Sequence, residues 1–317
     1  GERGGEMGRG LRCVSATLGL ALAFGGCTAA TKPPSGDGTY RILATTSVFA
    51  DLARLAVGDA VLVESIVPAG VDVHTFEPSP SDVARIASAD LIVANGLGLD
   101  AWIAKLISAA GKSSSVLLNL GDGLDSADGW TYLDARATGN VGAHDGVDPH
   151  VWLDPKGAAL YVEKIAARAS ADRPDLAAEI DAAKGGGLGE LARLDRELAA
   201  SFAAIPVERR RFVPFHDAFG YFARAYGIAV VGVAIQAPGQ EPSAKEIAAL
   251  IDAIRTANVT AIFSESQFPT RVAERIAAES GATVVASLFS DALGAAPADT
   301  YLGAMRANAA AILGAMR

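Results

Sequence analysis

Cysteine is nearly absent from this chain of 317 residues. Its two cysteines, Cys13 and Cys27, both lie near the start, so the remaining 290 residues offer neither a disulfide framework nor a thiolate metal site. Histidine is scarce as well, and the four copies are His74, His144, His150 and His216. Any soft metal held by the body of this protein must therefore be bound by imidazole and carboxylate groups.

Positive charge is also in short supply. The chain has 27 Lys and Arg against 36 Asp and Glu, which gives a net charge of -9, and no stretch is rich in Lys or Arg. This balance argues against a partner that is a nucleic acid. The composition, 50% hydrophobic and 20% charged, is typical of a folded globular protein, and the length suggests two domains.

The first 26 residues have the pattern of a signal peptide. Met7 begins a short basic segment, the apolar stretch from Cys13 to Phe24 follows, and two glycines precede Cys27. The apolar stretch is shorter than the roughly 20 residues that a membrane-spanning helix needs. We therefore predict that residues 1–26 are a signal peptide and that the protein is exported.

Small residues directly before Cys27 resemble a lipobox, in which the cysteine is lipidated and becomes the new N-terminus. Residues 27–39 are polar and rich in Pro and Gly, as expected for a tether between an anchor and a domain. The prediction is a protein anchored to the outer face of the cytoplasmic membrane, or periplasmic. The alternative is an ordinary secretory signal in which Cys27 has no role.

Short apolar runs alternate with helical patterns through the body, which predicts a parallel α/β fold. The predicted strands are 40–46, 60–67, 89–95, 115–120, 211–215, 228–234, 261–264 and 283–286. The predicted helices are 48–57, 82–88, 100–110, 155–169, 174–204, 217–226, 243–257, 270–280 and 298–316. Residues 121–149 show little periodicity and are predicted to form a long surface loop.

The helix predicted over 174–204 is long, and the run Gly185–Gly187 interrupts its pattern. Each interior glycine costs about 1 kcal/mol relative to alanine, so a kink or break is expected there. The α/β alternation restarts after this helix. We predict an N-terminal lobe over 40–173, the linking helix over 174–204 and a C-terminal lobe over 205–317.

Three of the histidines fall where a strand or loop meets a helix start. His74 follows the second predicted strand, His150 precedes a helix, and His216 lies between a strand and a helix. Ligands of open α/β folds bind beyond the carboxyl ends of the strands, so these imidazoles are candidates for one metal site. A single histidine at such a place is more often a cap or solvent-exposed. Neither an H-E-x-x-H nor a G-x-S-x-G motif is present, which argues against a zinc or serine hydrolase.

Several motifs together resemble the solute-binding lipoproteins of zinc and manganese ABC transporters, the A-I cluster. In order, they are Asp72-Val-His-Thr-Phe-Glu-Pro, Ala89-Asp-Leu-Ile-Val-Ala-Asn, Asp148-Pro-His-Val-Trp-Leu-Asp, Phe215-His-Asp-Ala-Phe-Gly-Tyr, Phe263-Ser-Glu, Ser290-Asp-Ala-Leu and Tyr301-Leu-Gly-Ala-Met-Arg-Ala-Asn. The resemblance covers roughly residues 40–317. It implies two α/β lobes joined by one rigid backbone helix, with a metal in the cleft between the lobes.

Carried over motif by motif, the resemblance implies a ligand set and secondary residues. The implied ligands are His74, His150, His216 and Asp291. Glu265 is implied to be an outer-shell or alternative ligand. The aspartates that flank the histidines, which are Asp72, Asp148 and Asp217, are better explained as loop turns and helix caps.

The implied function is capture of Zn(II) outside the cytoplasm and its delivery to an ABC permease, by a monomer without catalysis of its own. Four protein ligands make a closed tetrahedral site, whereas catalytic zinc keeps a position open for water. Manganese-importing relatives tend to have Glu at the third histidine position, so His216 favours zinc.

Two features of the resemblance leave alternatives open. Many zinc-binding relatives have a His-rich loop where this chain has His144 alone, which is a candidate for a transient zinc contact or a solvated residue. The alternatives to zinc transport are a manganese or iron protein of the same type, and a surface adhesin.

Overall fold

The computed structural model describes residues 38–127, 129–135, 146–236 and 238–317. The predicted signal peptide, Cys27 and His144 therefore lie outside the described residues. Among the residues that are described, no helix combines the length and apolarity that crossing a membrane requires.

The N-terminal part of the body is a parallel sheet with helices packed against it. Its elements are β1 (Arg41–Ala44), α1 (Ser47–Val57), β2 (Leu62–Ser65), α2 (Pro80–Ser88), β3 (Leu91–Ala94), α3 (Ile103–Ala109) and β4 (Leu117–Asn119). The strand order is β2-β1-β3-β4, and each neighbouring pair is parallel. The loops that follow these strands therefore gather at one edge of the sheet.

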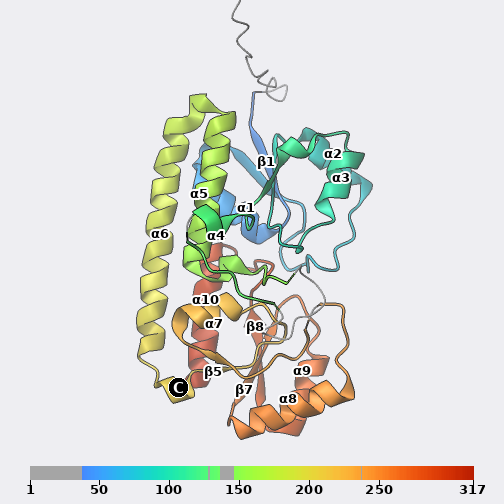
Figure 1. Cartoon of the computed structure of the whole chain (residues 1–317), viewed down its shortest axis with the longest axis vertical. Coiled ribbons are helices and arrows are strands. Elements are labelled where there is room, and N and C mark those ends of the chain that lie inside the picture. The colour runs from blue at the N-terminus through green and yellow to red at the C-terminus, as the bar shows by residue number, and fades with distance from the viewer. Residues whose placement is uncertain (1–37, 128, 136–145, 237) are drawn as a thin grey trace, which may run out of the picture. The chain divides into compact units, whose positions relative to one another are not determined.

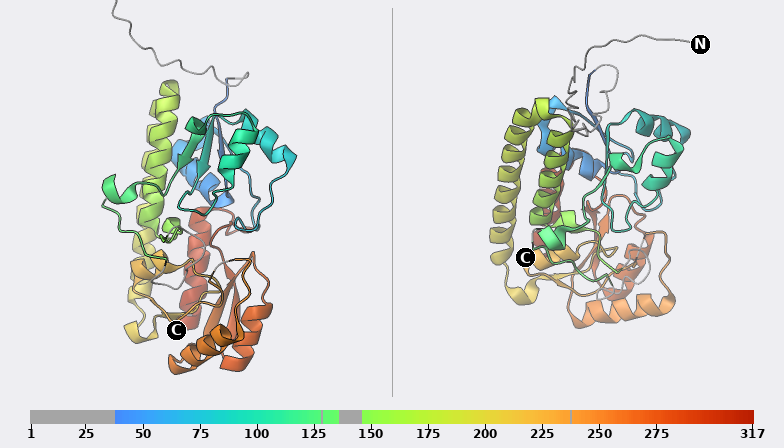
Figure 2. Two further views of the ribbon diagram at one scale, coloured as in Figure 1. Left: turned by 45° about the vertical axis from the view of Figure 1, so that its right-hand side comes forward. Right: turned by 45° about the horizontal axis from the view of Figure 1, so that its top comes forward.

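The C-terminal part repeats this arrangement. Its elements are β5 (Arg211–Phe212), α7 (Gly220–Tyr226), β6 (Ala229–Val230), α8 (Ala244–Thr256), β7 (Ala261–Glu265), α9 (Arg271–Ser280), β8 (Thr283–Leu288) and α10 (Tyr301–Met316). A bridge between Pro214 and Phe263 joins the β5–β6 pair to the β7–β8 pair, so the order is β6-β5-β7-β8, again parallel. Figure 2 shows α10, in red, beside the strands of this sheet.

Three helices connect the two sheets: α4 (Leu124–Ala127), α5 (Pro155–Asp172) and α6 (Ala177–Ala203). Figure 1 shows α6 running beside α5 and then past α7. A continuous hydrophobic core follows these helices and includes Phe49 of α1, Phe202 of α6 and Phe263 of β7. The two parallel sheets and the long helix confirm the predicted fold class. The exact lobe boundaries stay a prediction.

Two sequence predictions about the connecting region need correction. The loop over 121–149 contains the short helix α4, and Leu124 is buried in the core, so the described part of this segment is not simply a surface loop. The predicted break at Gly185–Gly187 is wrong because α6 continues through it. Here the absence of a side chain has a packing role, since a Cβ at Gly187 would lie 2.7 Å from the carbonyl oxygen of Leu55.

We expect the glycines of this run to respond oppositely to alanine. Gly186 is exposed, and nothing lies within 4 Å of a Cβ built there, so Gly186→Ala should raise the free energy of unfolding by about 0.5–1 kcal/mol. Gly187→Ala should lower it by about 1–3 kcal/mol, because the methyl group would overpack the contact with Leu55. Urea unfolding followed by circular dichroism measures both, and equal effects would contradict the packing role of Gly187.

Candidate metal site

His74 and His150 come from loops of the N-terminal part, and each is preceded by an aspartate that shapes its loop. His74 lies between β2 and α2, and its backbone N–H donates to Asp72 Oδ1 at 3.0 Å. The backbone N–H of His150 donates to Asp148 Oδ1, also at 3.0 Å, immediately before a 3-10 turn over 151–153 and α5. These bonds fit the turn-forming roles predicted for the two aspartates.

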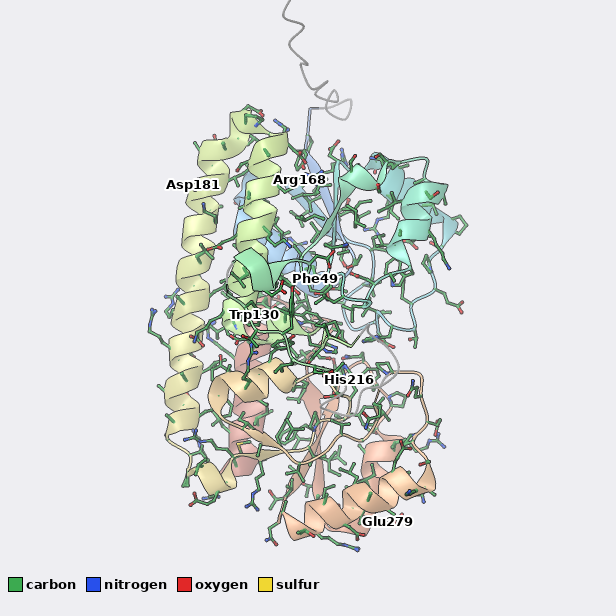
Figure 3. The ribbon with its side chains drawn as sticks, viewed as in Figure 1. Phe49, Trp130, Arg168, Asp181, His216 and Glu279 are labelled. Atoms are coloured by element: carbon green, nitrogen blue, oxygen red, sulfur yellow. The ribbon has the colours of Figure 1, made fainter. Side chains whose placement is uncertain are left out.

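His216 and Asp291 come from the C-terminal part. His216 follows β5 and pairs with Ile235 in a parallel bridge, which fixes its backbone at the carboxyl end of the sheet. Asp291 lies in the loop between β8 and α10. In Figure 3, His216 is labelled between the two groups of strands.

The structure brings the four predicted ligands together. The Nε2 atoms of His74 and His216 each lie 3.5 Å from Asp291 Oδ2, and that of His150 lies 3.6 Å from Asp291 Oδ1. One ligand atom from each of the four residues lies within 4.8 Å of every other. These distances place both oxygens of the Asp291 carboxylate against the imidazole nitrogens, within reach of one shared cation.

Because the four side chains are largely buried, the interactions between their charges are strong and shift the pKa values of His216 and Asp291. His74 keeps 10% of its side chain exposed, whereas the side chains of the other three are at most 1% exposed. Burial alone would raise the pKa of the Asp291 carboxyl, but the surrounding imidazoles, His216 first among them, lower it instead. Burial disfavours the charged form of His216, yet the Glu265 carboxylate and then Asp291 raise the pKa of His216 to about 9. The cluster is therefore a buried anionic pocket built for a cation.

Two further carboxylates stand behind the imidazoles. Asp148 Oδ1 lies 2.8 Å from His150 Nδ1, and Glu265 Oε2 is hydrogen-bonded to His216 Nδ1. Such partners fix the ring orientation and leave Nε2 to face the ion. Glu265, at the end of β7, thus lies behind His216 and outside the group of four. Its contacts match the outer-shell role rather than that of an alternative ligand.

The segment that carries Asp291 is also bonded to the N-terminal part. The indole N–H of Trp152 donates to the carbonyl oxygen of Ser290 at 3.0 Å. The backbone N–H of Leu293 donates to Ser47 Oγ of α1, also at 3.0 Å. Asp291 therefore lies between two hydrogen bonds, one to Trp152, two residues after His150, and the other to Ser47 of α1.

Sequence reasoning from local patterns missed Trp152 and Ser290. Both lie within two residues of a predicted ligand and inside the quoted motifs, and this position in the sequence could have pointed to them. Asp217 is buried beside His216 in the chain and contributes no atom to the group of four. His144 and Cys27 lie outside the described residues, so the loop contact and the lipid anchor stay predictions.

Comparisons with known proteins agree with this geometry. Residues 42–315 match the family model of the periplasmic zinc-uptake complex component A. The chain belongs to this family. It is 28% identical over 299 residues to the manganese ABC transporter substrate-binding lipoprotein PsaA of Streptococcus pneumoniae, covering 92% of this chain and 94% of that protein.

Two other relatives carry different metals in their names. The iron ABC transporter substrate-binding lipoprotein MtsA of Streptococcus pyogenes serotype M1 is 28% identical over 95% of this chain and 97% of its own. The periplasmic zinc-binding protein TroA of Treponema pallidum superposes with a TM-score of 0.78 at 27% identity, covering 88% of this chain and 99% of that one. Family members are metal-binding solute-binding proteins of ABC transporters and not enzymes, and divalent-metal binding follows for this chain.

The bond between Trp152 and Ser290 gives a test of how the site is held together. Trp152→Phe keeps an aromatic ring against Phe49 but leaves the buried Ser290 carbonyl unpaired, which should lower the free energy of unfolding by about 1–3 kcal/mol. Trp102→Phe is the control, because Trp102 Nε1 is buried and has no hydrogen-bond partner among the residues that the structure describes. Equal losses in denaturant unfolding would show that ring size, and not this hydrogen bond, matters.

Proposed function

We propose that this protein captures Zn(II) outside the cytoplasm with His74, His150, His216 and Asp291, and delivers it to an ABC permease. The observation that carries the proposal is the buried cluster of three imidazoles around one carboxylate. Four protein ligands close a tetrahedral site and leave no position for an activated water. Such a site suits capture and release rather than hydrolysis.

The donor set supports zinc over manganese. Three of the four donors are nitrogen, and imidazole suits zinc, whereas manganese favours oxygen ligands. Because the named relatives carry zinc, manganese or iron, the choice of zinc rests on these residues. A manganese or iron protein of the same type is the alternative.

The pattern of burial supports a cargo role. His74 is the one ligand with appreciable exposure, so an ion reaches the cluster from its side. The loop that carries His74 packs near Gly239, where an added Cβ would lie 3.6 Å from the Thr75 methyl group. An entrance lined by loops from both parts of the chain suits repeated loading and unloading.

The remaining parts of the proposal concern location. Relatives named as lipoproteins or periplasmic proteins support a place outside the cytoplasm, where a permease would receive the ion. The signal-like residues 1–26 and the lipobox-like sequence before Cys27 support export and a lipid anchor. Mass spectrometry of the protein purified from membranes would detect a diacylglyceryl group on Cys27.

We expect the purified protein, stripped with chelator, to retain zinc in competition with equimolar manganese. Three imidazoles bind zinc far better than manganese, so mass spectrometry of the desalted protein should find mainly zinc, about one ion per chain. Iron(II) under anaerobic conditions completes the comparison. Preferential retention of manganese or iron would overturn the zinc assignment.

Removing a ligand should weaken zinc binding more than the roughly 10–100-fold lost with an outer-shell partner. His216→Ala removes one donor from the group of four, and Asp291→Asn removes the negative charge of another. Asp299→Asn is the matched control, because Asp299 is exposed and lies outside that group. Calorimetric titration with a competing chelator measures the affinities, and tight binding by both ligand variants would refute the site.

A further inference from the structure

A chain of hydrogen bonds leads from the surface of the C-terminal part to His216. The side-chain amide of Gln267 donates to Ser290 Oγ at 2.9 Å, and the Ser290 hydroxyl donates to Glu265 Oε2 at 3.1 Å. The same oxygen of Glu265 is bonded to His216 Nδ1. None of these three partners is among the four clustered ligands.

The direction of each bond in this chain is determined by chemistry. A serine hydroxyl has one hydrogen, and the carboxylate of Glu265 can only accept it. The Ser290 oxygen is then the acceptor for the Gln267 amide. His216 likewise donates from Nδ1 to Glu265, so Nε2 is the ring nitrogen that faces the cluster.

A β-bulge brings Glu265 and Ser290 together. Ser264 pairs with Ala286, but Glu265 pairs with Leu288, so β8 has one extra residue at this point. The bulge lies at the end of both strands, next to the site, where such irregularities re-aim side chains. It places the segment after β8 so that Ser290 reaches the Glu265 carboxylate.

Ser290 also makes one of the hydrogen bonds that link the two parts of the chain. Its carbonyl oxygen accepts the Trp152 indole N–H, while its hydroxyl holds Glu265. The residue is 2% exposed and directly precedes Asp291. One residue thus contacts the groups that orient His216 and the element that carries His150.

We propose that Ser290, supported by Gln267, is a positioning residue for metal binding that holds Glu265 and so fixes the orientation and tautomer of His216. The inference rests on the proposed role of His216 as a ligand. Neither Ser290 nor Gln267 contacts the ion itself. Their loss leaves all four ligands in the chain but frees the Glu265 carboxylate to move away from the imidazole.

Ser290→Ala should weaken zinc binding by about tenfold, the lower end of the loss caused by removing an outer-shell partner. Gln267→Leu should also weaken zinc binding, but less strongly. It removes the amide that donates to the Ser290 hydroxyl and leaves the hydroxyl itself in place. Ser290→Thr retains a hydroxyl and should restore most of the affinity. Affinities are measured by titration against a competing chelator.

Ser264→Ala is the matched control. Ser264 is fully buried, directly precedes Glu265 on β7, and its Oγ has no hydrogen-bond partner within the described residues. Neighbouring residues on a strand face opposite sides, so this substitution removes a hydroxyl of equal burial without touching the chain of bonds. It should leave zinc affinity unchanged.

Two spectroscopic measurements separate positioning from a general loss of stability. Nitrogen NMR of the metal-free protein, labelled at histidine and held at alkaline pH, should show neutral His216 protonated at Nδ1 in the parent and a mixture of the two neutral tautomers in Ser290→Ala. The visible absorption of the cobalt-loaded protein should change in the same variant. Thermal unfolding of the metal-free proteins shows whether each variant is folded.

Wild-type affinity and spectra in a folded Ser290→Ala variant would overturn the proposal. If that variant does not fold, Gln267→Leu decides, and a parent-like nitrogen spectrum there would also overturn it. Failure of the proposed function has a different result, because zinc affinity would then survive His216→Ala itself.

Discussion

The site depends on one buried carboxylate, that of Asp291, held among three imidazoles. Its two oxygens lie 3.5–3.6 Å from the Nε2 atoms of all three histidines, so it touches every other member of the cluster. A lone carboxylate at 1% exposure would be costly. The imidazoles around it lower its pKa and so favour the charged form. A divalent cation can bind in the same arrangement, with the carboxylate oxygen and the ring nitrogens as its ligands.

The backbone around Asp291 explains how two separate sheets produce one site. Ser290 is bonded to Trp152, Leu293 accepts from Gly70 and donates to Ser47, and all three partners belong to the N-terminal part. Yet the segment follows β8 of the C-terminal sheet. It therefore fixes the distance between ligands that come from both parts. The hydrophobic core along α5 and α6, which both parts share, also holds the two parts together.

The sequence predicts those features of the fold and the site that depend on local patterns, and it misses those that depend on contacts between distant residues. The alternation of apolar runs and helical patterns predicted nearly every element, because those signals are local. The prediction of a break at Gly185–Gly187 was wrong because helix propensity takes no account of packing between helices. Gly187 packs on Leu55 of α1, and α6 continues through the glycines. Three histidines stood out because each lies where a strand or loop meets a helix start, whereas Asp291 came from the family resemblance alone. The link from Ser290 to Glu265 depends on a bulge that no sequence pattern reveals.

The carboxylates behind the imidazoles, Asp148 and Glu265, help to explain how a closed site can release its ion. Three neutral imidazoles and one carboxylate leave a positive charge on bound Zn(II), and Asp148 and Glu265 lie directly behind two of the rings to offset it. Without the ion, Glu265 and Asp291 favour a proton on His216, as its raised pKa indicates. Ion and protons therefore compete for one set of buried charges. A site of this kind holds a divalent cation through charge balance as much as through ligand bonds, and a change in that balance is a route to release.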